Sequence, residues 1–268
     1  MSAKLYRKGV IYMDMGLQNK VAVITGGSEG IGFAAARAFI AEGAYAAVCG
    51  RRKDVLEQAV AKLGPRAFGV PCDMTKEEEV HDFARRVFDR FGRIDVWVNN
   101  VGATIARKGT WYTGKEIDQT YAVNFKSVVM GSQAAVPYLS RQGGVIVNVA
   151  SLAARCATSG RATLYGAFKA GVVNFTNTFA GEVASKHIRV VSILPGFTLT
   201  PLVRATIAAD DLEKQSRTCL LRRAAEPEEI AGPIVFLASS QASYMTAASL
   251  EISGGRSMTL NPGYSYGE

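Results

Sequence analysis

The chain has 268 residues, of which 48% are hydrophobic and 20% are charged, and it carries a formal net charge of +8 at pH 7. This is the composition of a well-packed globular protein, and no apolar run reaches the roughly 18 to 20 residues that a membrane-spanning helix needs. The basic pairs Arg51-Arg52, Arg85-Arg86 and Arg222-Arg223 are dispersed along the chain, whereas nucleic-acid binding requires a basic stripe or patch. We therefore expect no nucleic-acid partner and no membrane partner.

The N-terminus, the cysteines and the histidines predict a cytoplasmic protein without a metal. The apolar run GVIYM near the N-terminus is too short for the core of a signal peptide, and we treat residues 1–16 as an extension. The two histidines do not group with the cysteines, which show no CxxC spacing. Free thiols fit a reducing compartment. The cysteines are Cys49, Cys72, Cys156 and Cys219.

From residue 20 onward, short apolar runs alternate with amphipathic or Ala-rich segments. The alternation predicts strands within 20–27, 44–50, 66–73, 94–102, 143–151, 188–196 and 249–255. It predicts helices at 31–44, 53–64, 75–92, about 115–140, about 165–185 and 226–239. For the third of these helices, Thr75 and Glu78 have the spacing of a capping box.

The strand runs are almost continuously apolar, which is typical of strands buried on both faces of a sheet. Strands that alternate with helices of this length form right-handed crossovers around a parallel sheet. No repeat or linker divides the sequence. We therefore predict an α/β fold, a Rossmann-type doubly wound parallel sheet, in one domain over residues 17–268.

A glycine-rich loop, TGGSEGIG, lies between the first predicted strand and the first predicted helix. Gly26, Gly30 and Gly32 let the backbone approach a ligand closely, and the helix N-terminus offers free N–H groups to a pyrophosphate. The loop therefore predicts a dinucleotide at the carboxyl edge of the sheet. Its spacing resembles the TGxxxGxG loop of the short-chain dehydrogenase/reductase family.

Further motifs strengthen this resemblance, which covers roughly residues 17–258. In chain order they are NNVG at 99–102, Asn124, Ser151, Tyr165 with Lys169 in YGAFK, and Pro195-Gly196 with Thr200. Ser151 precedes Tyr165 by 14 residues, whereas the family usually has 13. We place the additional residue in the loop at 152–164, which should border the substrate.

Tyr165 and Lys169 lie four residues apart, so they share one helix face, and a nearby ammonium lowers the pKa of a phenol. Tyr165 is thereby suited to act as general acid/base. The resemblance implies that Lys169 also holds the nicotinamide ribose and that Ser151 hydrogen-bonds the substrate oxygen. It further implies that Asn124 anchors a water molecule that links Lys169 to solvent.

The residues after the second strand point to NADP(H) as the preferred cofactor, with NAD(H) as the alternative. Gly50 stands where an NAD-binding relative would usually carry Asp, and Arg51 can bond a 2′-phosphate through two hydrogen bonds. Glu29 argues against this, because NADP-preferring relatives often carry a basic residue there. Asp73 resembles the residue that bonds the adenine amino group, and a helix-capping role stays open for it. Together with Tyr165 and Lys169, the expected cofactor-binding residues are Gly26, Ser28, Gly30, Ile31, Gly32, Arg51, Arg52, Asp73, Met74, Asn100, Val101, Gly102, Pro195, Gly196, Thr198 and Thr200.

The segment at about 196–225 is expected to cover an apolar pocket as a substrate lid. The predicted activity interconverts a secondary alcohol and a ketone by hydride transfer. The substrate is an alicyclic, hydroxysteroid-like compound or a 3-oxoacyl compound, and the alternative function is a non-catalytic dinucleotide-binding regulator or scaffold. Trp111 and Tyr112 are expected in the same cavity or at a subunit contact. Relatives are commonly tetramers, so we expect a homotetramer that pairs through the helices at 115–140 and 165–185.

Overall fold

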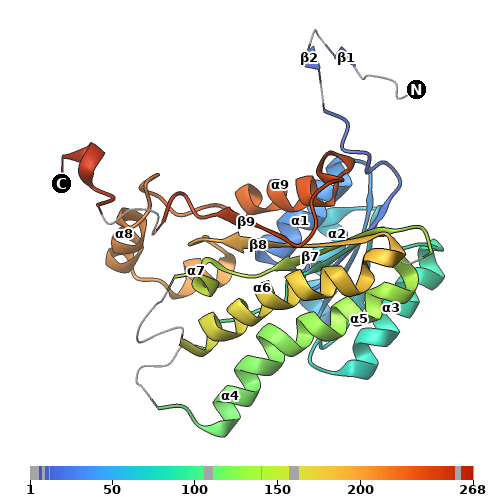
Figure 1. Cartoon of the computed structure of the whole chain (residues 1–268), viewed down its shortest axis with the longest axis horizontal. Coiled ribbons are helices and arrows are strands. Elements are labelled where there is room, and N and C mark those ends of the chain that lie inside the picture. Colours follow the sequence, from blue (N-terminus) through green and yellow to red (C-terminus); the bar gives the residue numbers. More distant parts are fainter. Residues whose placement is uncertain are drawn as a thin grey trace.

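The computed structural model of the protein describes residues 6–7, 10–11, 13–105, 111–139, 141–156, 163–256 and 261–267. Its centre is a seven-stranded sheet in the order β5-β4-β3-β6-β7-β8-β9, in which every neighbouring pair is parallel (Figure 1). All the strands predicted from residue 20 onward are confirmed. They are β3 (Val21–Ile24), β4 (Tyr45–Gly50), β5 (Ala67–Pro71), β6 (Val96–Asn99), β7 (Gly144–Val149), β8 (Ile188–Pro195) and β9 (Ala248–Ile252).

Helices cover both faces of this sheet, which confirms the doubly wound fold. One buried cluster joins α1, α2 and α9 to one face, and a second joins α3, α5 and α6 to the other. Chain order reverses between β3 and β6, and ligands of such sheets bind outside the carboxyl ends of the strands at this point. The helices are α1 (Gly30–Ala41), α2 (Lys53–Leu63), α3 (Glu77–Phe91), α4 (Gly114–Tyr121), α5 (Ser127–Leu139), α6 (Thr163–Val183), α7 (Pro201–Thr206), α8 (Ala209–Arg217) and α9 (Pro227–Ala238).

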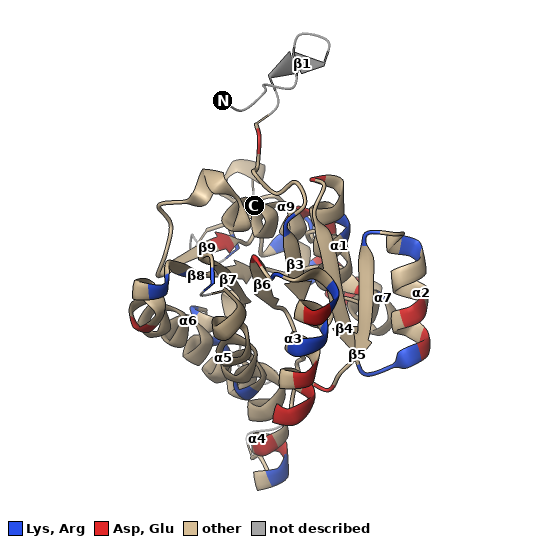
Figure 2. Cartoon of the chain, turned by 90° about the vertical axis from the view of Figure 1, so that its right-hand side faces the viewer, with Lys and Arg blue, Asp and Glu red and all other residues tan. Residues whose placement is uncertain are grey.

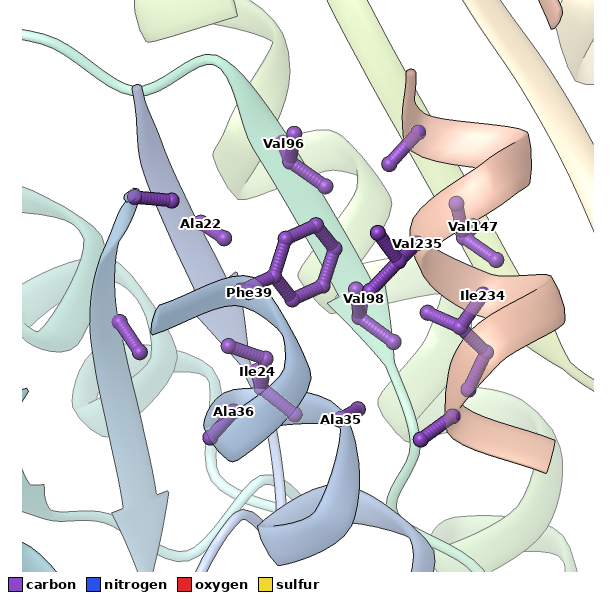
Figure 3. Packing of buried hydrophobic residues seen from close by; sticks show 14 of the residues in the cluster. Ala22, Ile24, Ala35, Ala36, Phe39, Val96, Val98, Val147, Ile234 and Val235 are labelled. Atoms are coloured by element: carbon purple, nitrogen blue, oxygen red, sulfur yellow. The ribbon is translucent and has the colours of Figure 1, made fainter. Parts of the chain in front are cut away.

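The packing of α1 and α9 against the sheet places the glycine loop. Phe39 of α1 is fully buried between strand residues such as Val96 and the α9 residue Val235 (Figure 3). Small residues of α1, including Ala35 and Ala36, let the helix lie close to the strands. The N-terminus of α1 is therefore held rigidly at the carboxyl edge of the sheet.

Most charged residues of α2 and α3 lie on the outer faces of these helices. Along α2 and α3, basic and acidic side chains alternate and do not gather into one basic face (Figure 2). Several of them pair one helical turn apart, as Arg85 does with Asp82 and with Asp89. Such exposed pairs stabilise a fold by only about 0 to 1 kcal/mol each.

The predicted capping box at the start of α3 is wrong. The helix begins at Glu77 with Lys76 as its cap, because the chain first makes a turn at Asp73. The Asp73 carboxylate accepts hydrogen bonds from the backbone N–H and the hydroxyl of Thr75, at 3.0 and 2.8 Å. Glu79, rather than Glu78, then accepts the backbone N–H of Asp73 at 2.8 Å.

Two further features were not predicted. Residues 6–7 and 10–11 form a short antiparallel pair, β1 (Tyr6–Arg7) and β2 (Val10–Ile11). The helix expected at about 115–140 is divided, since a π-helical segment at Ala122–Lys126 separates α4 from α5. This segment contains Asn124.

Candidate active site

The glycine loop makes a tight turn at the N-terminus of α1. Gly26 and Gly30 have positive φ angles of 64° and 56°, and a Cβ added at Gly32 would lie 2.4 Å from the carbonyl oxygen of Gly26. The cap residue Glu29 makes no side-chain hydrogen bond to the helix, and the first turn carries no acidic residue. The amide groups and the positive end of the helix dipole are therefore available to an anion such as a pyrophosphate.

Thr25 joins the glycine loop to the segment that follows β6. Its hydroxyl accepts hydrogen bonds from the backbone N–H groups of Asn100 and Val101, at 2.9 and 3.2 Å. The Asn100 side chain returns a bond to the carbonyl oxygen of Thr25 at 2.9 Å and contacts that of Gly26 at 3.2 Å. The structure thus brings together the glycine loop and NNVG, on either side of the point where strand order reverses.

Ser151 and Tyr165 meet above the end of β7. Ser151 is the second residue after that strand, and its hydroxyl accepts the backbone N–H of Ala153 at 3.1 Å. Tyr165 is half-buried on the first turn of α6. Burial raises the pKa of Tyr165, and a hydrogen bond with the Ser151 side chain lowers it by less, so the net pKa lies above the usual value.

Lys169 lies one helical turn further along α6 and is only 2% exposed. Its ammonium donates to the carbonyl oxygen of Val149 at 2.8 Å and lies 5.7 Å from the centre of the Tyr165 ring. Burial lowers the pKa of Lys169 to about 8. Our expectation that Lys169 lowers the pKa of Tyr165 does not hold in this structure, because burial outweighs every other influence on the phenol.

Asn124 is completely buried in the π-helical segment. Its side chain accepts the backbone N–H of Ala103 at 3.0 Å and donates to the carbonyl oxygens of Ala103 and Thr120, at 2.9 and 3.0 Å. Single π-helical turns are frequent at functional sites. Here the turn anchors the chain beyond NNVG.

Gly102 lies between Asn124 and Lys169. A Cβ at this position would lie 2.9 Å from the Lys169 ammonium nitrogen and 3.2 Å from the Asn124 side-chain oxygen. The absence of a side chain at residue 102 therefore lets these two predicted catalytic residues approach each other. Asn124, Ser151, Tyr165 and Lys169 are thus gathered around the ends of β6 and β7, as the motif order led us to expect.

The region expected to hold adenosine carries charged side chains. Gly50 faces Ser28, since an added Cβ would lie 3.0 Å from the Ser28 hydroxyl oxygen. Arg51 is exposed, whereas Arg52 forms an ion pair with Glu29. Burial raises the pKa of Asp73. The hydrogen bonds from Thr75 and the charge of Arg51 together lower it by more than burial raises it, so the net pKa is below its usual value.

The chain after β8 returns to the glycine loop. Thr200 caps α7 by accepting the backbone N–H of Val203 at 3.3 Å, and its methyl group would lie 3.3 Å from a Cβ at Gly30. Thr198 is buried and donates to the carbonyl oxygen of Gly196 at 3.2 Å. The remaining predicted cofactor residues differ in setting: Ile31 lies in the first turn of α1, Pro195 ends β8, and the Met74 side chain is buried beside Cys72.

The expected lid at 196–225 contains α7 and α8, and its two ends are joined to each other. Thr198 and Ala225 form a parallel bridge, and Arg204 of α7 pairs with Glu226 through both carboxylate oxygens, at 2.7 and 2.6 Å. Beneath its ends is a small hollow whose lining includes Phe197 and Ile252. The expected lining residue Tyr112 is half-buried and Trp111 is 83% exposed.

Several residues important for the geometry had not been predicted. Thr25 carried a signal, because a polar side chain at the end of an apolar strand requires a partner. The carbonyl groups of Val149 and Ala103 carried none, because backbone acceptors exist at every residue. Residues 157–162 of the loop at 152–164 lie outside the described part of the chain. The additional residue that we placed in this loop therefore stays a prediction.

A family model described as enoyl-(acyl carrier protein) reductase matches residues 26–257. The chain is 36% identical to a 3-oxoacyl-(acyl-carrier-protein) reductase of Thermotoga maritima over 253 residues, which cover 90% of this chain and 99% of that protein. It is 34% identical to a 7alpha-hydroxysteroid dehydrogenase of Bacteroides fragilis over 250 residues, 89% of this chain and 94% of the relative. A short-chain type dehydrogenase/reductase structure from Mycobacterium marinum superposes with a TM-score of 0.86 at 32% identity, covering 91% and 97% of the two chains.

The chain belongs to the short-chain dehydrogenase/reductase family. It is an NAD(P)-dependent oxidoreductase that acts on a small molecule. Within the residues that the structure describes, we find no helix both long enough and apolar enough to cross a membrane.

Proposed function

We propose that this short-chain dehydrogenase/reductase interconverts a secondary alcohol and a ketone with NADP(H). The observation that carries the proposal is the joint placement of Ser151, Tyr165 and Lys169 at the carboxyl edge of the sheet. The Ser151 side chain lies close enough to the Tyr165 phenol to lower its pKa, and the Lys169 ammonium is held beside the ring by a hydrogen bond to Val149. A proton donor and a second hydroxyl thus face the same small volume.

In the direction of reduction, Tyr165 is the general acid. Its raised pKa keeps the phenol protonated at neutral pH, which is the form that donates a proton to a substrate oxygen. The Ser151 hydroxyl hydrogen-bonds the same oxygen and orients the carbonyl. In the reverse direction the phenolate removes the alcohol proton, and the Lys169 ammonium, 5.7 Å from the centre of the Tyr165 ring, offsets part of the cost that burial imposes on that anion.

The proposed cofactor site is the cradle formed by the glycine loop, NNVG and the segment at 195–200. The tight turn that Gly26 and Gly32 permit, with the uncapped N-terminus of α1, fits a pyrophosphate. A bound nicotinamide supplies or accepts the hydride. Lys169 would hold the nicotinamide ribose, Asp73 the adenine, and Asn124 a water molecule beside Lys169.

Our proposal of NADP(H) over NAD(H) depends on Arg51. No acidic side chain is present at Gly50, and Arg51 acts electrostatically on Asp73 at the adenosine end. Arg51→Ala should raise the KM for NADPH and leave that for NADH unchanged. An unchanged KM for NADPH would contradict the preference.

For the substrate, we propose an alicyclic secondary alcohol or ketone, or a 3-oxoacyl compound. The names of the two relatives, a hydroxysteroid dehydrogenase and a 3-oxoacyl-(acyl-carrier-protein) reductase, support both classes. Ketones of each class should be supplied with either reduced nucleotide while the absorbance of the reduced nicotinamide is followed. Turnover of neither class would favour a dinucleotide-binding regulator.

The proton step is tested by Tyr165→Phe. This variant should lose turnover and still bind the nucleotide, because only the phenolic oxygen is removed. Tyr138→Phe is the matched control, since Tyr138 lies on α5 and packs on Phe88 at a ring distance of 5.1 Å. Normal turnover by Tyr165→Phe would refute the proposed mechanism.

We further propose a cytoplasmic homotetramer that pairs through α4–α5 and α6. The exposed face of α6 carries the small residues Ala167, Ala170 and Gly181, which permit close helix packing. The four cysteines are free, as in a reducing compartment. Light scattering at several protein concentrations measures the number of subunits.

A further inference from the structure

Glu29 and Arg52 connect the glycine loop to the end of β4 by an ion pair. Glu29 is the residue before α1, and Arg52 is the residue before α2. Their side chains are 49% and 63% exposed, so water and solutes can reach the pair. Since both segments border the proposed adenosine site, the pair lies where the two cofactors differ by a phosphate.

The geometry of α1 shows that the Glu29 side chain does not cap this helix. Its backbone is extended, with a φ of −151° and a ψ of 168°, and its carboxylate does not cap the helix. Among the described residues, the hydrogen-bond partner of that carboxylate is the Arg52 guanidinium. The Glu29 carboxylate therefore binds the Arg52 guanidinium, which would otherwise be available to an incoming anion.

Arg51 differs from its neighbour. Within the described part of the chain it forms no ion pair, and its charge acts on Asp73 from a distance. The two consecutive arginines thus differ in their availability to an anion. The Arg51 guanidinium has no ion-pair partner among the described residues, whereas the Arg52 guanidinium is paired with Glu29. A 2′-phosphate would meet Arg51 directly, but it would reach Arg52 only by displacing the carboxylate of Glu29.

We propose that Glu29 is a specificity-determining residue that limits the preference for NADP(H) by holding Arg52. This inference depends on the proposed dinucleotide site. With NAD(H), the ion pair stays intact and costs the complex nothing. With NADP(H), the 2′-phosphate competes with Glu29 for Arg52, and the like charges of phosphate and carboxylate repel each other.

The test compares the Kd of NADPH and NADH for the wild-type protein and for Glu29→Gln, measured by the fluorescence of the reduced nicotinamide. An exposed ion pair changes an equilibrium by up to about fivefold, and the loss of repulsion adds to this. We therefore expect Glu29→Gln to bind NADPH about five- to tenfold more tightly, with the Kd of NADH changed by less than about twofold.

Two further variants separate this mechanism from a general effect of charge. Glu57→Gln removes the same charge from an exposed pair on α2, where Glu57 lies 3.8 Å from Lys53, and should leave both Kd values unchanged. In an Arg52→Gln background, most of the gain from Glu29→Gln should disappear. Thermal melting of each variant shows that the fold is retained.

The outcomes distinguish the inference from the proposed function. If the wild-type protein binds neither nucleotide, the proposed function fails. If both bind but Glu29→Gln leaves the ratio of the two Kd values unchanged, the role of Glu29 is refuted. A gain of the same size without Arg52, or an equal gain in Glu57→Gln, also refutes it.

Discussion

Lys169 donates a hydrogen bond to the carbonyl oxygen of Val149 at 2.8 Å, and this contact joins α6 to the last residue of β7. Ser151 follows two residues later, and Tyr165 lies one helical turn before Lys169. The bond therefore fixes the position of α6 relative to the end of β7, and so it also places Tyr165 near Ser151. The same contact buries an ammonium, which has a measurable effect on stability.

Replacing Lys169 by Met should change how the free energy of unfolding depends on pH. The pKa of Lys169 is about 8 in the folded protein and about 10.5 when unfolded, so the unfolded chain binds more protons between these values. The contribution of Lys169 to stability thus rises as pH increases from 8 toward 10.5. Relative to Lys169→Met, the wild-type protein should gain about 2 kcal/mol between pH 7.5 and pH 10. Urea denaturation at both pH values measures this, and parallel curves for the two proteins would contradict it.

Gly102→Ala should reduce turnover by about 100-fold or more without unfolding the protein, because the new Cβ displaces Lys169 and Asn124. A Cβ there would lie 2.9 Å from the Lys169 nitrogen. Gly232→Ala is the matched control, because a Cβ at that position on α9 meets nothing within 4 Å. That variant should keep its activity and gain roughly 0.5 to 1 kcal/mol in stability. Similar turnover in both variants would show that space at Gly102 is unimportant.

Thr25→Val should destabilise the fold by about 1 to 3 kcal/mol, because the backbone N–H groups of Asn100 and Val101 lose their acceptor. The side chain keeps its shape, so the change reports the hydrogen bonds. Thr178→Val is the control, since this exposed threonine bonds only to carbonyl groups of its own helix. Urea denaturation measures both variants. An equal loss in the two would indicate a general effect of removing a hydroxyl.

Ser151→Ala should shift the pH dependence of ketone reduction and lower its rate. The hydrogen bond from Ser151 lowers the pKa of Tyr165, so its removal raises that pKa further. The phenol then stays protonated to higher pH, and the alkaline limb of the rate profile moves upward. Profiles of kcat/KM against pH for the two proteins measure the shift. A limb that moves to lower pH would assign the titration to another group.

The seven strands and the order of the motifs could be predicted from the sequence, because strands buried on both faces of a parallel sheet are continuous apolar runs. The pairing of Tyr165 with Lys169 followed from helical periodicity, since residues four apart share a face. The start of α3 could not be predicted in the same way. Thr75 and Glu78 have the spacing of a capping box. However, the Asp73 carboxylate accepts the backbone N–H of Thr75 in a turn, so the helix begins only at Glu77.

The sequence by itself therefore determined the fold class and placed the glycine loop between the first strand and the first helix, and it supplied the polar residues that we propose for the site. Tertiary structure decided what each of them touches. Lys169 donates to the backbone carbonyl of Val149, a contact that cannot be predicted from residue types because every residue has a carbonyl. Burial raises the pKa of Tyr165, whereas Lys169 was expected to lower it. The partner of Arg52 is Glu29, 23 positions away, because two loops meet at one edge of the sheet. Local periodicity dictates which residues share a face, whereas contacts and desolvation depend on segments that only the folded chain brings together.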